Sequence, residues 1–162
     1  MVDNKINTID KEKLKLFIHL LQKVQKPLNK TFDLGLIVKE PESEISSNRI
    51  FEEIKQIVAI EKITYDESSF DEEIIEKIIN AFEKGRWIFL EIKKDIGSLL
   101  LNQLKHLANY NALQLIDYRG KEVFEMKMPE DARVIVFAER DFIENKISYP
   151  HFYILFGPTL SI

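Results

Sequence analysis

Three short apolar runs constrain the fold of this 162-residue chain more than any other feature. They lie within residues 32–38, 87–92 and 133–138. In the apolar part of each run, apolar residues follow one another instead of alternating with polar ones. Strands of this kind are buried on both faces, as in a parallel sheet covered by helices. Helical patterns separate the runs. The sequence therefore predicts an α/β fold, a three-layer α/β/α domain with a mainly parallel sheet.

The remaining elements follow from apolar periodicity and from turn residues. Asp10 is expected to cap the first helix, after a loose N-terminus at residues 1–8. Gly85 fits the C-terminal end of the third helix. We expect one domain over 1–162, with helices near 10–26, 50–57, 74–82, 97–110 and 141–146, further strands at 58–65 and 152–156, and an inserted hairpin at 113–116 and 123–128.

The bulk composition restricts the classes of function. Charged residues make up 31% of the chain and the net charge is −4, which does not favour a nucleic-acid surface. There is no cysteine, so a thiolate nucleophile and a cysteine zinc site are excluded. The first ten residues are polar, and no apolar run approaches the ~20 residues of a membrane helix, so we expect a cytoplasmic protein that does not enter a membrane.

The segment after the first apolar run has the strand–loop–helix layout of a phosphate-binding loop. Residues 39–46 read Lys-Glu-Pro-Glu-Ser-Glu-Ile-Ser. This segment resembles the Walker A motif Gly-Glu-Pro-Gly-Ser-Gly-Lys-Ser of AAA+ ATPases of the MoxR, McrB and midasin type. The matching residues are Glu40, Pro41, Ser43 and Ser46. The departures, where three glycines and the lysine belong, are Lys39, Glu42, Glu44 and Ile45.

These departures remove what such a loop needs to hold a phosphate. Its glycines let backbone N–H groups converge on the anion, and its lysine reaches the outer phosphates. Here Glu40, Glu42 and Glu44 are expected to face the triphosphate, while Ile45 replaces the cation. Each like-charge contact at about 4 Å costs on the order of 1–4 kcal/mol. We therefore expect neither ATP nor any other cofactor to bind.

Later segments extend the resemblance over most of the chain, from about Leu14 to Phe156. Residues 85–87 read Gly-Arg-Trp and begin a run that is similar to the Walker B strand. In that alignment Glu91 stands for the magnesium-binding aspartate and Ile92 for the glutamate that activates water. Glu139 is the residue nearest to the expected sensor 1 asparagine. The resemblance implies that the strand at 32–38 lies at the centre of the sheet beside the strand at 133–138.

The function implied by this resemblance is that of a catalytically inactive AAA+-like domain. Because Ile92 cannot accept a proton, ATP hydrolysis is not expected. We expect no counterpart of the helical lid domain that normally follows in the family. We expect the domain to bind another protein or a second copy of itself, with an active AAA+ subunit as one candidate partner.

A metal-dependent nuclease is the competing interpretation. Glu91-Ile92-Lys93 after an apolar strand is similar to the Glu-x-Lys element of PD-(D/E)xK nucleases, and Asp66 or Asp71 would supply the second carboxylate. The histidines share no metal-ligand spacing, so we expect no metal site of another kind. The three histidines in question are His19, His106 and His151.

A third alternative is an α/β binding domain unrelated to ATPases.

Overall fold

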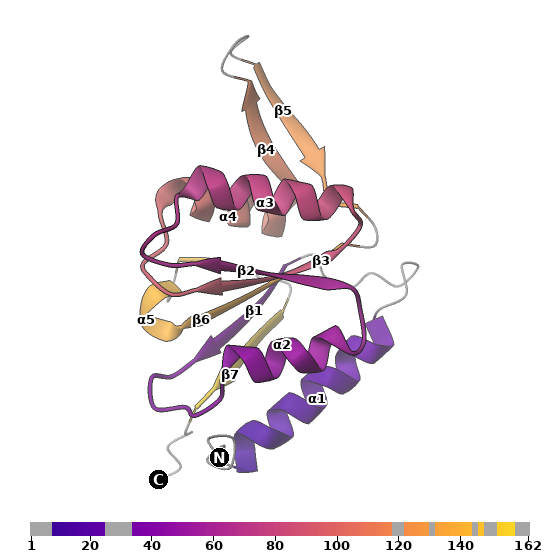
Figure 1. Ribbon diagram of the computed structural model, residues 1–162, viewed down its shortest axis with the longest axis vertical. Helices are drawn as coiled ribbons and strands as arrows, with labels where there is room; N and C mark the ends of the chain where they lie inside the picture. Colours follow the sequence, from indigo (N-terminus) through magenta and orange to yellow (C-terminus); the bar gives the residue numbers. More distant parts are fainter. Residues whose placement is uncertain are drawn as a thin grey trace.

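A computed structural model describes residues 8–24, 34–117, 122–129, 132–143, 146–147 and 152–157 of the chain. Figure 1 shows the elements in these ranges. The helices are α1 (Thr8–Val24), α2 (Ser47–Lys55), α3 (Asp71–Glu83), α4 (Ser98–Tyr110) and α5 (Arg140–Ile143). The strands are β1 (Leu34–Lys39), β2 (Ile60–Tyr65), β3 (Trp87–Ile92), β4 (Ala112–Asp117), β5 (Glu122–Lys127), β6 (Val134–Glu139) and β7 (Phe152–Phe156).

The central sheet has five strands in the order β2-β3-β6-β1-β7. All four neighbouring pairs in it are parallel. The predicted fold class is therefore confirmed, as a parallel sheet flanked by helices in three layers (Figure 1). The expected pairing of β1 with β6 is present, with Leu34 opposite Val134, although β6 rather than β1 holds the middle position.

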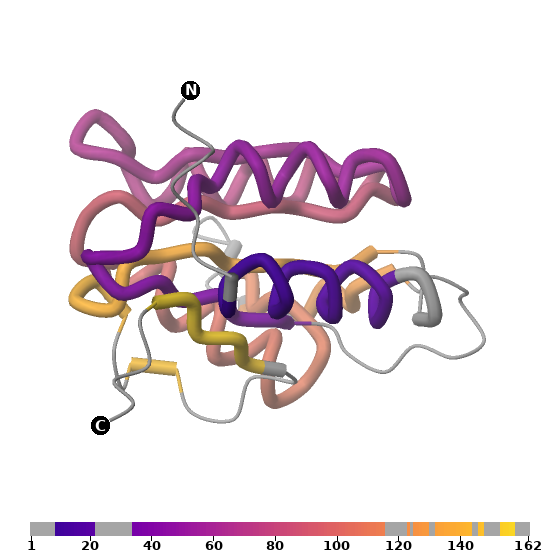
Figure 2. Tube along the Cα trace, turned by 90° about the horizontal axis from the view of Figure 1, so that it is seen from below, coloured from indigo at the N-terminus to yellow at the C-terminus, as the bar shows by residue number. Residues whose placement is uncertain are grey.

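Each face of the sheet carries its own apolar core, which explains why the central strands lack alternation. Helices α1 and α2 run side by side over one face, and α3 and α4 cover the other (Figures 1 and 2). Along β1, Leu36 and Val38 join the core under α3 and α4. Ile37, which points the other way, joins the core under α1 and α2.

Local hydrogen bonds fix where the helices begin and end. Ser46 caps α2, because its hydroxyl accepts from the N–H of Arg49 at 3.1 Å. Helix α4 is capped by a neighbour, since the N–H of Leu100 donates to the Asp71 carboxylate at 2.9 Å. Gly85 follows α3 with φ of +67°, the left-handed conformation that the sequence predicted for this position.

The predicted hairpin is a separate two-stranded sheet formed by β4 and β5 beyond α4 (Figure 1). Gln103 of α4 attaches it, because its side-chain amide donates to the carbonyl oxygen of Gln114 at 2.5 Å and accepts from the N–H of the same residue at 2.9 Å. The predicted connection at residues 118–121 lies outside the described residues.

The prediction for Asp10 is wrong. Helix α1 begins at Thr8, so Asp10 lies in its first turn rather than ahead of it, and it is buried. The remainder of the predicted loose N-terminus, residues 1–7, and the predicted helix end at residues 25–26 lie outside the described ranges. Within those ranges, no helix combines the length and apolar character needed to cross a membrane.

Candidate functional site

A cleft of about 520 Å³ lies at the carboxyl ends of β1, β3 and β6. This is the edge at which open α/β sheets bind their ligands. Its charged lining residues are two lysines and two glutamates, so their formal charges cancel. The lining residues are Lys39, Lys93, Glu91, Glu139, Ser46, Ser47, Ile45, Ile92, Phe137 and Phe142.

The loop between β1 and α2 uses its own polar groups to hold its shape. The ammonium of Lys39 donates to the carbonyl oxygen of Ser43 at 3.0 Å. Backbone N–H groups of Glu40, Ser43 and Ile45 donate to Phe156 O, Glu40 O and Ser43 Oγ, at 2.7, 2.9 and 3.3 Å. These three donors therefore have acceptors within the chain and do not converge on an anion in the cleft, as they would in a phosphate cradle.

A buried carboxylate on α1 holds this loop in place through hydrogen bonds. Asp10 is fully buried; its two oxygens accept from the Ser43 hydroxyl at 2.9 Å and from the N–H of Gly157 at 3.0 Å. Gly157 has φ of +149°, and a Cβ there would lie 2.6 Å from Cγ of Glu40. A larger residue would push Glu40 and the loop away, so glycine is required at this position.

The glutamates of the loop do not line the cleft, contrary to the expectation that they would face a triphosphate. Glu40 pairs with Arg140 at 2.5 Å, while Glu42 and Glu44 are exposed. Ile45, in the position of the motif's lysine, is 2% exposed and packs in the core under α1 and α2. The missing cation is thus replaced by a core residue, and the added carboxylates point elsewhere.

Glu91, at the end of β3, is held by two partners. It accepts from the hydroxyl of Ser47 at 2.6 Å and lies 3.4 Å from the ammonium of Lys62. The sequence comparison assigned the motif's last serine to Ser46, but Ser46 caps α2 and its neighbour Ser47 contacts the carboxylate.

Of the other candidate nuclease residues, Lys93 lies at the cleft and Asp71 begins α3. Lys93 lines the cleft with Glu91. Asp71 accepts from the Tyr65 hydroxyl at 2.7 Å and from the N–H of Leu100. Burial raises the pKa of the Tyr65 phenol, and the hydrogen bond to Asp71 raises it further.

Asp66 organises the turn after β2. Its carboxylate accepts from the hydroxyl and N–H of Ser68, at 2.8 and 3.0 Å, and from the hydroxyl of Ser69 at 3.1 Å. The bonds from Ser68 and then from Ser69 lower the pKa of the Asp66 carboxyl below its ordinary value, because they stabilise the charged form.

Metal ligands are not gathered in the part of the chain that the structure describes. No three His, Asp or Glu residues there are placed to hold a metal ion together. His106 instead contacts Glu125 of the hairpin at 3.0 Å, and His19 lies on α1. His151 falls outside the described residues.

No model of a known protein family matches the chain, and no curated protein matches it either.

The buried contacts of Asp10 predict that its removal lowers the stability of the fold. Asp10→Ala leaves the Ser43 hydroxyl and the Gly157 N–H without their buried acceptor, so we expect a loss of about 2–4 kcal/mol in the free energy of unfolding. Urea denaturation measures this. Glu12→Ala, an exposed carboxylate on the same helix, should change stability by no more than about 0.5 kcal/mol. Equal small effects in both variants would refute the anchoring role.

Proposed function

We propose that this chain is a catalytically inactive, AAA+-like domain that acts by binding other proteins. The order of the segments supports this proposal: a strand, a loop that resembles Walker A and a helix are followed by a strand that resembles Walker B, and β1 lies beside β6. The domain is proposed to use no nucleotide and no metal.

The observation that carries the proposal is the set of hydrogen bonds inside the loop. A phosphate loop works because free N–H groups point at the anion. The N–H groups of Glu40 and Ser43 already have backbone acceptors at 2.7 and 2.9 Å. Binding a triphosphate would require these bonds and the contact between Ser43 and Asp10 to break. The free energy of those contacts would then be lost from the binding reaction.

The chemistry around the cleft also supports the absence of hydrolysis. A general base must stand within reach of the attacking water. Ile92 offers no such group, and Glu91 is engaged by Ser47 and Lys62. Glu139 is the other carboxylate of the cleft. It would lie beside a phosphate that no converging N–H groups neutralise, while the ammonium of Lys39 is engaged by the carbonyl oxygen of Ser43.

The proposed activity is therefore association with a protein in the cytoplasm. The partner is an active AAA+ subunit or another copy of this chain, since the ATPases that it resembles work as rings. The formal charge of −4 gives no general attraction to nucleic acid. An α/β binding domain without ancestral link to ATPases is the alternative within the same class of function.

One observation favours the nuclease alternative: Glu91 and Lys93 line the same cleft. Its other requirement is a second carboxylate beside Glu91. Asp66 is occupied by Ser68 and Ser69, and Asp71 by Tyr65 and Leu100. We therefore place the nuclease second.

Calorimetry tests the nucleotide part of the proposal. Titration with Mg-ATP should give no saturable heat up to about 1 mM, since phosphate contacts with the N–H groups of Glu40 and Ser43 must replace internal hydrogen bonds. Magnesium tripolyphosphate tests the loop without the adenosine. Sub-millimolar Mg-ATP affinity that disappears in Lys39→Ala would contradict the proposal. Affinity that persists in Lys39→Ala would place the nucleotide outside this loop.

A cleavage assay separates the proposal from the nuclease. Single- and double-stranded DNA should remain intact with Mg²⁺ or Mn²⁺, because the carboxylates in the described ranges are not gathered around a metal position. Metal-dependent cleavage that is lost in Glu91→Ala but retained in Glu61→Ala, which alters a carboxylate on β2, would favour the nuclease.

A further inference from the structure

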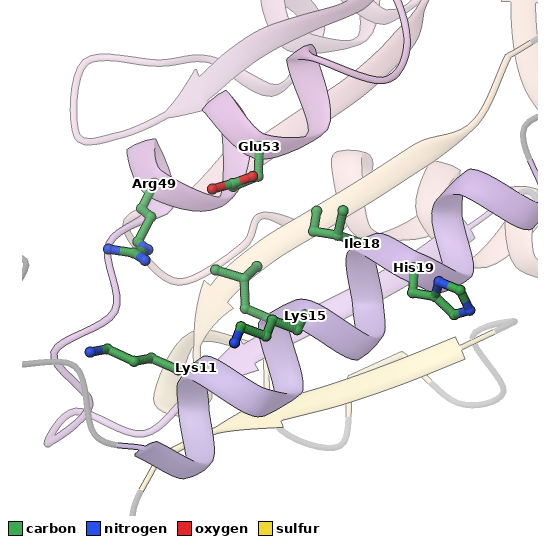
Figure 3. Close-up of a pocket in the computed structure, with 7 residues that line it drawn as sticks. Lys11, Lys15, Ile18, His19, Arg49 and Glu53 are labelled. Atoms are coloured by element: carbon green, nitrogen blue, oxygen red, sulfur yellow. The ribbon is translucent and has the colours of Figure 1, made fainter.

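A groove of about 370 Å³ lies between α1 and α2 and shares no lining residue with the cleft (Figure 3). Leu14 and Ile18 of α1 form its apolar lining. A protein cavity of roughly 150 Å³ already holds a benzene molecule, so the groove has room for one aromatic side chain. It lies on the outer surface of the helical layer and opens to solvent.

The polar rim of the groove is mainly basic. Lys11 and Lys15 project from α1 and Arg49 from α2, while Glu53 is the one carboxylate among the lining residues (Figure 3). Within the described part of the chain, none of these three cations forms an ion pair. The Nε of Arg49 is buried there without a hydrogen-bond partner. An acidic partner would satisfy these groups.

A complementary feature lies at the start of α3. Phe70 is 70% exposed, although large aromatic residues usually bury most of their surface. Exposed glutamates accompany it on both sides, Glu67 before it and Glu72 and Glu73 after it. The hydrogen bonds of Asp66 and the bond from Lys94 to the carbonyl oxygen of Ser69 at 3.0 Å hold this turn rigid. A turn that is already ordered loses little backbone entropy on binding.

The groove and the Phe70 turn cannot meet within one molecule. Helices α1 and α2 cover one face of the sheet, and α3 covers the other (Figure 1). A contact between them must therefore join two copies. It would use a different surface on each copy, which makes it a head-to-tail contact.

We propose that the chain associates with itself head to tail, with Phe70 of one copy in the groove between α1 and α2 of the next. Glu67, Glu72 and Glu73 then face Lys11, Lys15 and Arg49, which matches three carboxylates with three cations. Such contacts repeat, giving a ring if the rotation between copies closes and a filament if it does not. This inference deepens the proposed function by naming a second copy as the partner, and it does not depend on whether the loop binds nucleotide.

Sedimentation velocity at low salt, about 50 mM NaCl, over a range of concentrations tests the proposal. We expect concentration-dependent association that weakens in 500 mM NaCl, where the Debye length is about threefold shorter. Phe70→Ala and the double variant Lys15→Glu/Arg49→Glu should each raise the dissociation constant about tenfold or more. Phe70 makes no side-chain capping bond, so its loss should leave the melting temperature unchanged.

Mixing the two variants gives the sharpest result. The Phe70→Ala copy keeps its groove and the Lys15→Glu/Arg49→Glu copy keeps its Phe70, so an equimolar mixture should form dimers but no larger species. Tyr110→Ala removes an aromatic residue of similar exposure, 65%, and Lys105→Glu reverses an exposed charge on α4; both should associate as the unmodified chain does.

Two results would overturn the proposal. The first is an unmodified chain that stays monomeric at about 100 µM in low salt, even if its groove binds a different acidic protein. Association could also persist unchanged in both variants. A monomer that still fails to bind Mg-ATP would refute self-association alone and leave the inactive-domain proposal standing.

Discussion

The buried carboxylate of Asp10 connects three segments that are far apart in the sequence: helix α1, the loop after β1 and the end of β7. By accepting from the Ser43 hydroxyl, it holds that residue inside the protein instead of at the cleft. The N–H groups of Glu40 and Ser43 in turn donate to the carbonyl oxygens of Phe156 and Glu40. A segment placed where α/β proteins bind ligands has thereby become part of the internal framework.

The fold could be predicted from the sequence because its main signals are local. The apolar run at 87–92 coincides with β3, and the predicted last strand coincides with β7. Central strands that are buried on both faces consist of consecutive apolar residues, and this pattern can be read from the sequence. The start of α1 was missed because Asp10 looks like a capping residue, and its contact with Gly157 spans 147 positions, which no local pattern reveals.

The candidate site was only partly accessible to sequence reasoning. Glu91 and Glu139, which the resemblance singled out on β3 and β6, both line the cleft. Side-chain direction was not accessible: the loop glutamates point away from the cleft, and Ile45 packs inward because an aliphatic residue gains most by joining the core. Lys62 was missed because its approach to Glu91 depends on the pairing of β2 with β3.

Amide hydrogen exchange measured by NMR tests most directly whether the loop is held by its own chain. The N–H groups of Glu40 and Ser43 should be protected ~100-fold or more relative to those of Glu42 and Glu44, for which the described residues provide no acceptor. Adding Mg-ATP should leave all four rates unchanged. Rapid exchange at Glu40 and Ser43 that becomes slow only with Mg-ATP would show a functional phosphate cradle and contradict this account.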